Sequence, residues 1–159
     1  MRKLSFAVLT LWALVQGVAA ADWPMVGADP GRTGYSAQEL PATLSLVWTY
    51  QATHAPMPAW PRSDRQPFDR AYQPVIAAGT LYFGSSADGK VYALDAATGK
   101  ERWSFVTGGP VRFAPAVARE RVYAVSDDGF LYCLAAADGK VLWQKRGGLM
   151  SLTLTVRVA

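Results

Sequence analysis

The acidic side chains of this sequence could bind a metal ion or move protons, so their positions decide which chemistry is open to it. Asp127-Asp128-Gly129 places two carboxylates side by side, an arrangement that could suggest calcium. Calcium requires about six to eight oxygen ligands, and the spacing of a calcium loop is absent. We therefore predict no catalytic or metal-binding set, and expect structural roles in turns for Asp88, Asp95, Asp127, Asp128 and Asp138.

The chain contains one histidine and one cysteine. His54 lies in a proline-rich stretch with Trp60 nearby, and we expect a solvated loop residue rather than a ligand or general base. Cys133 lies between Tyr132 and Leu134 in a predicted strand, and a single thiol cannot form an intrachain disulfide. We therefore expect Cys133 to be a small buried residue and the domain to be stabilised by packing alone.

The elements that carry these residues form an internal repeat, in which residues 71–107 resemble residues 112–146. A period of about 40 residues, with short apolar runs separated by Asp-Gly turns, is typical of a four-stranded propeller blade. The sequence therefore predicts an all-β partial β-propeller of four-stranded antiparallel blades, with blade repeat 1 over 71–109 and blade repeat 2 over 110–146. The matched pairs include Pro74 with Pro115, Tyr82 with Tyr123, Gly89 with Gly129, Tyr92 with Tyr132, Leu94 with Leu134, Gly99 with Gly139 and Trp103 with Trp143.

Turn residues place the four strands of the first blade at 74–77, 80–85, 90–94 and 100–105. Asp88-Gly89 suits a two-residue hairpin turn whose central residues have positive φ. Residues 91–94 and 122–125 show little polar alternation, which indicates strands that are covered on both faces. Stacking of blade on blade would provide that cover.

Residues 1–21 have the pattern of a secretory signal peptide. Arg2 and Lys3 precede an uncharged run over 4–18, and small residues follow before Asp22. The run is shorter than the roughly 20 apolar residues that a membrane-spanning helix needs. We expect an exported protein, periplasmic or extracellular, with no stable membrane span after cleavage.

The charge of the mature chain gives no support for nucleic-acid binding. Removal of Arg2 and Lys3 would lower the formal net charge from +4 to +2. The remaining basic residues are scattered among turns and strand ends rather than gathered on one face. A lipoprotein anchor is not expected either, because the only cysteine lies deep in the second repeat.

Residues 22–51 are expected to form an ordered strap followed by a closure strand. Prolines in the strap remove backbone donors and disfavour continuous sheet, while Trp23 can be buried. Residues 47–50 resemble 102–105, so Trp48 is a candidate closure residue on the last strand of another blade. The proline-rich stretch over 52–70 is predicted to be an inserted loop.

The eleven residues from Ala93 to Trp103 resemble the motif of pyrroloquinoline quinone (PQQ) enzyme repeats, and Asp-Trp-Pro at 22–24 resembles the opening of exported members. The motif residues are Ala93, Asp95, Thr98, Gly99 and Trp103. The resemblance implies that Trp103 packs on Ala93 and reaches Gly139 of the adjacent blade. A glycine lets the indole approach a peptide plane, and the indole N–H needs one acceptor.

The second copy of the motif departs from the pattern. Cys133, Ala135 and Asp138 replace alanine, aspartate and threonine, so only Gly139 and Trp143 are carried over. The resemblance also implies that quinoprotein dehydrogenases hold their cofactor with calcium, a catalytic aspartate and often a pair of adjacent cysteines. None of these can be assigned in this chain.

Two functional hypotheses follow. The first is an exported, non-catalytic scaffold or binding platform, with a protein or other ligand as partner, no evident cofactor and no nucleic acid. The second is the N-terminal piece of a PQQ-dependent dehydrogenase whose catalytic residues lie downstream, with PQQ and calcium as cofactors. The sequence favours a non-enzyme for this chain and leaves the second hypothesis open.

Residues 147–159 depart from the repeat, although 151–159 alternate apolar and polar side chains as a strand would. A propeller needs about four to eight blades, and the chain supplies about two. We therefore expect a fragment of a longer chain or a frame broken near Gly147 or Gly148. In an open ring the outer blade faces would expose apolar side chains, so self-association is also expected.

Overall fold

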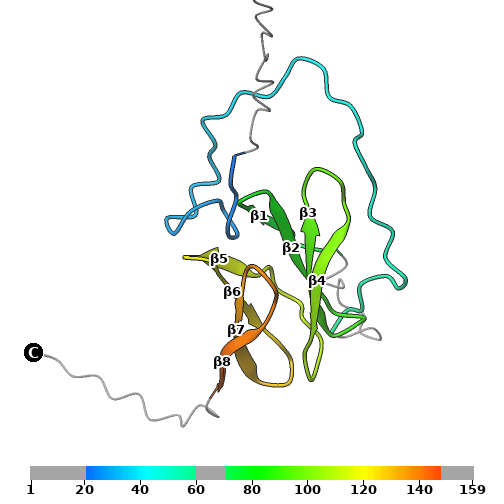
Figure 1. Cartoon of the computed structure of the whole chain (residues 1–159), viewed down its shortest axis with the longest axis vertical. Coiled ribbons are helices and arrows are strands. Elements are labelled where there is room, and N and C mark those ends of the chain that lie inside the picture. Colours follow the sequence, from blue (N-terminus) through cyan, green and yellow to red (C-terminus); the bar gives the residue numbers. More distant parts are fainter. Residues whose placement is uncertain (1–20, 60–70, 148–159) are drawn as a thin grey trace, which may run out of the picture.

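The computed structural model describes residues 21–59 and 71–147. These form two four-stranded antiparallel sheets in which each strand pairs with the next along the chain (Figure 1). The first sheet contains β1 (Val75–Ala77), β2 (Thr80–Ser85), β3 (Lys90–Asp95) and β4 (Glu101–Val106). The second contains β5 (Ala116–Ala118), β6 (Arg121–Val125), β7 (Phe130–Ala135) and β8 (Val141–Arg146).

The predicted fold class is confirmed, because the two sheets coincide with the two sequence repeats and the described residues contain no helix. Three expectations lie wholly or partly outside the described residues. They are the signal peptide over 1–21, the later part of the inserted loop with Trp60, and the tail over 147–159. No helix among the described residues is long and apolar enough to cross a membrane.

The hairpin between β2 and β3 differs from its prediction. Ser85 pairs with Lys90, so four residues connect the strands rather than two, and only Gly89 among them has positive φ, at 61°. The Ser85 hydroxyl donates to the Asp88 carboxylate at 2.9 Å and accepts the Asp88 N–H at 3.1 Å. These two bonds close a wider turn than Asp-Gly alone requires.

A β-bulge occurs at the same place in both blades. The register shifts between Ala93 and Leu94 in the β3–β4 pair, and between Cys133 and Leu134 in the β7–β8 pair. The shift leaves Ala93 opposite Trp103 and Cys133 opposite Trp143. Because a bulge re-aims the side chains beside it, its repetition gives the two tryptophans the same place on their sheets.

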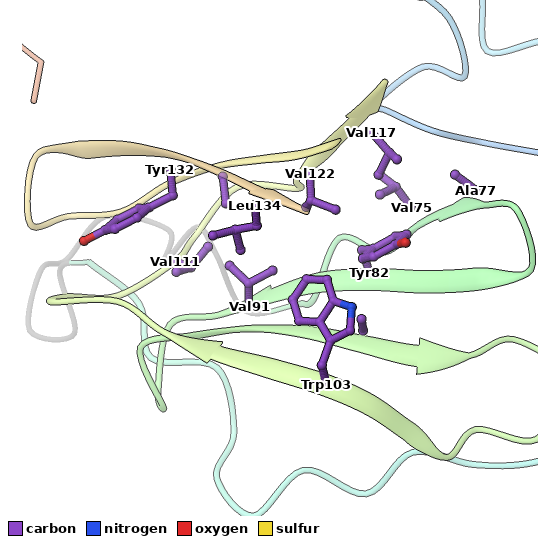
Figure 2. Packing of buried hydrophobic residues seen from close by; sticks show 12 residues of the cluster. Val75, Ala77, Tyr82, Val91, Trp103, Val111, Val117, Val122, Tyr132 and Leu134 are labelled. Atoms are coloured by element: carbon purple, nitrogen blue, oxygen red, sulfur yellow. The ribbon is translucent and has the colours of Figure 1, made fainter. Parts of the chain in front are cut away.

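The core lies between the two sheets, where Trp103 enters from the first blade and Val122 and Leu134 face it from the second (Figure 2). Val111, in the connection between the blades, is fully buried and its side chain fills the space that a Cβ at Gly84 would take, 2.3 Å away. The β3 residues Val91 to Leu94 are buried on both faces as expected. In β6, however, Val125 is 43% exposed, because the described residues provide no sheet to cover the far side of the second blade.

The N-terminal strap joins the innermost strands of the two blades. Trp23 exchanges two backbone hydrogen bonds with Ile76 of β1, at 2.7 and 2.9 Å, and the next carbonyl, of Pro24, accepts the N–H of Val117 in β5 at 2.8 Å. The Asp22 carboxylate accepts the N–H of Ala78 in the β1–β2 turn at 2.9 Å. The Asp-Trp-Pro segment therefore binds both blades and links one to the other.

The expected closure strand over residues 44–51 is not formed. Within this segment, part of the wide cyan arc in Figure 1, Leu46 is 83% exposed and Val47 is 75% exposed. A strand needs a hydrogen-bonded neighbour, and none of the eight described strands pairs with these residues. Trp48 and Tyr50, by contrast, pack on the first blade.

We predict that Trp103→Ala will destabilise the chain by about 3–5 kcal/mol, because the removed indole is 9% exposed between the sheets. Such a loss is comparable to the stability of a whole domain. Chemical denaturation followed by far-UV circular dichroism measures it.

Trp143→Ala provides the matched control, since Trp143 has the same place on the second blade and is 40% exposed. Trp143→Ala should lower the free energy of unfolding by less than about 1 kcal/mol. Equal losses for the two variants would contradict the role assigned to Trp103.

Candidate functional site

The contact between the blades centres on the Trp103 indole. Its Cε3 atom would lie 2.6 Å from a Cβ at Gly139, and its Nε1 donates to the carbonyl of Ala136 at 2.9 Å. The glycine has a φ of 72°, which other residues rarely adopt. The Phe105 ring, two residues along β4, packs against Tyr132 of the second blade with centroids 5.3 Å apart.

Trp48 makes the same set of contacts on the first blade. Its Cδ2 atom would lie 2.7 Å from a Cβ at Gly99, and its Nε1 donates to the carbonyl of Ala96 at 2.9 Å. Tyr50, two residues on, packs near Tyr92 with centroids 6.1 Å apart. Residues 48–50 therefore occupy on the first blade the place that β4 occupies on the second, although they are not in a strand.

Trp143 lies opposite Cys133, which is fully buried, and its ring packs near Tyr123 at a centroid distance of 6.0 Å. Trp103 has the same relation to Tyr82, at 5.8 Å. Unlike Trp103, however, Trp143 meets no glycine among the described residues and is 40% exposed. The structure thus brings Trp103 to Gly139 and Trp48 to Gly99, whereas Trp143 has no docking glycine among the described residues.

The remaining motif residues build the turn that carries the docking glycine. The Asp95 carboxylate accepts the N–H and the hydroxyl of Thr98, at 2.9 and 2.8 Å, and pairs with Arg102 at 2.6 Å. The Arg102 guanidinium and the Thr98 bonds lower the pKa of Asp95 to about 2. Asp138 in the second blade pairs with Lys140 at 2.7 Å instead. Both aspartates thus brace a turn.

At the opposite end of each blade, an aspartate accepts a tyrosine hydroxyl. Asp88 binds Tyr92 at 3.1 Å, and Asp128 binds Tyr132 at 2.6 Å. Asp128 also accepts the N–H of Gly108 at 2.8 Å, which ties the connection between the blades to the second blade. These aspartates lie in turns as expected, but the bond to tyrosine was not expected; its signal in the sequence is the repeated Asp-Gly-x-x-Tyr spacing.

The described part of the inserted loop is anchored over the blade connection. The Met57 N–H donates to the Ser86 hydroxyl at 2.8 Å, and Arg112 donates to the Met57 carbonyl while pairing with Asp127 at 2.7 Å. The His54 side chain is 68% exposed and its Nδ1 lies 3.3 Å from the Asp88 carboxylate. The anchoring role of Arg112 was not expected, because nothing in the sequence links it to a residue 55 positions away.

An apolar groove of about 230 Å³ lies on the face of the first blade that points away from the second. Trp48 and Tyr50 line it, and the buried side chains of Phe83 and Leu94 form part of its floor. Nowhere in residues 21–59 and 71–147 do three potential metal-ligating side chains come together. The groove is lined by Trp48, Tyr50, Tyr72, Pro74, Leu81, Phe83 and Leu94.

The two repeats match a known protein family. A family profile, PQQ_2, described as outer membrane protein assembly factor BamB, matches residues 37–159. The chain belongs to this PQQ-like repeat family. No curated protein matches the chain.

Among solved structures, the quinohemoprotein alcohol dehydrogenase from Comamonas testosteroni is 26% identical, with a TM-score of 0.61 over 79% of this chain and 19% of the enzyme. BamB from Moraxella catarrhalis is 25% identical, with a TM-score of 0.41 over 43% of this chain and 20% of that protein. The PQQ-like chain therefore spans no more than about a fifth of these two proteins.

We predict that acid will destabilise the fold through Asp128. Partial burial raises the pKa of this carboxyl, but the Tyr132 hydroxyl and the backbone N–H donors together hold it below its usual value. A lowered folded-state pKa contributes stability that is present above the unfolded value of about 3.9 and is lost as pH falls through the folded value.

Asp128→Asn should therefore lower stability by about 1 kcal/mol at pH 7, after allowance for solvent screening. The difference from wild type should shrink as pH falls from about 5 to below the folded-state pKa. Thermal melts across this range measure it, with Glu39→Gln on the exposed strap as control. A deficit that does not change with pH would contradict the role of the charge.

Proposed function

We propose that the chain is part of an exported, non-catalytic propeller that acts as a scaffold or binding platform for a protein partner. The observation that carries this proposal is that the aspartate side chains form structural hydrogen bonds. Every aspartate within the described residues accepts a hydrogen bond in a turn, strap or connection. These aspartates are Asp22, Asp29, Asp88, Asp95, Asp127, Asp128 and Asp138.

Two further features support a binding role. The family description, an outer membrane protein assembly factor, concerns the assembly of other proteins. The first blade also carries an apolar groove whose lining includes the half-buried rings of Trp48, Tyr50 and Tyr72, and aromatic side chains contribute much of the energy of protein interfaces.

The proposal of export rests on the sequence. Arg2 and Lys3 followed by the uncharged run over 4–18 provide the charged start and apolar centre of a signal peptide. Mass spectrometry of the expressed protein should find a mature N-terminus next to Asp22 in the exported fraction.

The second candidate function is the N-terminal piece of a PQQ-dependent dehydrogenase. The alignment with a quinohemoprotein alcohol dehydrogenase over 79% of the chain favours it. Bound PQQ would supply the redox chemistry, with calcium beside it. No three His, Cys, Asp or Glu side chains come together in residues 21–59 and 71–147, so under this hypothesis the carboxylate ligands of the metal would lie outside these residues.

We predict that the protein, incubated with PQQ and calcium, will neither bind PQQ saturably nor reduce an artificial electron acceptor with alcohols or sugars. Calorimetric titration measures binding and dye reduction measures turnover. A known PQQ-dependent dehydrogenase, reconstituted in parallel, verifies both assays. Turnover that depends on PQQ and calcium would overturn the non-catalytic function and support the second candidate.

A further inference from the structure

The outer edge of each blade is formed by its last strand, because the strands of each sheet follow chain order and β4 and β8 come last. None of the described strands pairs with β4 or β8 on its outer side. The chain runs on from β4 into the second sheet and leaves the β4 edge open. By the repeat, the β8 edge is open in the same way whether or not further blades follow.

The first blade shows which side chains stay accessible at such an edge when a neighbouring blade is in place. Trp103 of β4 is buried against the second blade. The alternate positions of β4 remain exposed, namely Arg102, Ser104 and Val106. The second repeat has its own side chains at the equivalent positions of β8, which are Leu142, Gln144 and Arg146. Stacking of a further blade would therefore leave these three side chains exposed.

The free edge of β8 presents backbone hydrogen-bonding groups at defined positions. The N–H of Gly147 donates to the carbonyl of Gly129 at 2.8 Å, and hydrogen-bonded pairs alternate along an antiparallel ladder. Lys145 therefore belongs to the next bonded pair with β7, so Gln144 and Arg146 turn their N–H and C=O groups outward. An extended segment that adds to this edge would bind these groups.

The side chains at the β8 edge are apolar at one end and basic at the other. Leu142 is 50% exposed, and no acidic side chain among residues 21–59 and 71–147 pairs with Lys145 or Arg146. The β4 edge differs, because Arg102 takes the place of Leu142 there and pairs with Asp95. Charged side chains protect an edge against added strands, so β8 is the more receptive of the two edges.

The charge at the end of β8 selects the strand that can add. Opposite charges on neighbouring strands stabilise a sheet, and an unmatched charge does not. Two β8 edges paired antiparallel about Gln144 would place each Arg146 beside Leu142 of the other copy, which satisfies neither side chain. A strand with a carboxylate opposite Arg146 and an apolar side chain beside Leu142 satisfies both, and a second copy of β8 lacks that carboxylate.

We propose that the outer edge of β8 binds an extended acidic segment of a partner protein, which adds to the sheet as an antiparallel strand. A carboxylate of this segment lies opposite Arg146, and an apolar side chain four residues later lies beside Leu142. The inference rests on the proposed binding role and names the chemistry of the partner. It is independent of the number of blades in the ring.

NMR titration of the isotopically labelled chain with a capped synthetic peptide, Thr-Asp-Thr-Thr-Thr-Val-Thr, tests the proposal. The peptide should shift the amide signals of Gln144 and Arg146 and slow the exchange of their N–H groups, without effect on Ser104. A peptide with lysine in place of aspartate is the control and should bind more weakly. Arg146→Glu should reverse this preference, because it reverses the charge opposite the probe.

Gln144→Pro removes one outward donor and no bond to β7, and edge strands tolerate proline where the N–H faces solvent. The variant should weaken binding of the aspartate peptide at least about threefold, since one hydrogen bond contributes about 0.5–1.5 kcal/mol. Ser104→Pro makes the matching change on β4 and should leave binding unchanged. Circular dichroism melts establish whether each variant is folded.

Three results overturn the proposal: equal binding of the two peptides, equal weakening by Gln144→Pro and Ser104→Pro, or exchange at Gln144 and Arg146 that the aspartate peptide does not slow. If Gln144→Pro is unfolded, exchange in the wild-type chain decides. Sedimentation velocity addresses the other occupant. Self-association that Gln144→Pro abolishes, in a chain that does not bind the aspartate peptide, would make a second copy the occupant and overturn the proposal.

These outcomes are separate from the PQQ assays. A chain that binds neither the peptide nor PQQ loses this partner but keeps the non-catalytic function. A chain that turns over with PQQ and calcium loses the proposed function whether or not it binds the peptide.

Discussion

The close approach of an indole to a glycine peptide is the constraint on which the arrangement of the blades depends. A Cβ at Gly139 would lie 2.6 Å from Trp103, and one at Gly99 would lie 2.7 Å from Trp48. Both glycines also need a positive φ. The turn from Ala135 to Lys140 provides that backbone for Gly139, and the β-bulge beside Ala93 aims Trp103 at it, so local features of both blades serve the one contact between them.

Hydrogen bonds hold the parts of each blade that lie away from this contact. The Asp88–Tyr92 and Asp128–Tyr132 pairs close the far end, while the strap residues Trp23 and Pro24 bind one inner strand of each blade. The blades are therefore joined at their outer strands by an indole and at their inner strands by the strap. This double attachment holds the two blades together.

Much of this could be predicted from the sequence, because a repeat of about 40 residues encodes each blade locally. The ends of the strands of the first blade differ from their predicted positions by at most one residue, and the fold class is confirmed. Two features could not be predicted because they depend on groups far apart in the chain: residues 44–51 lack a strand neighbour, and Arg112 meets Met57 only in the folded chain. The hairpin widened for a local reason, because the side chain of Ser85 bonds Asp88 three residues on.

The central claim, that glycine docking fixes the tryptophans, is tested most directly by hydrogen exchange of the indole N–H groups, followed by NMR. Exchange should be slow for Trp103 and Trp48, whose Nε1 atoms donate to carbonyls at 2.9 Å, and fast for the exposed Trp143. Exchange at Trp103 as fast as at Trp143 would contradict the account.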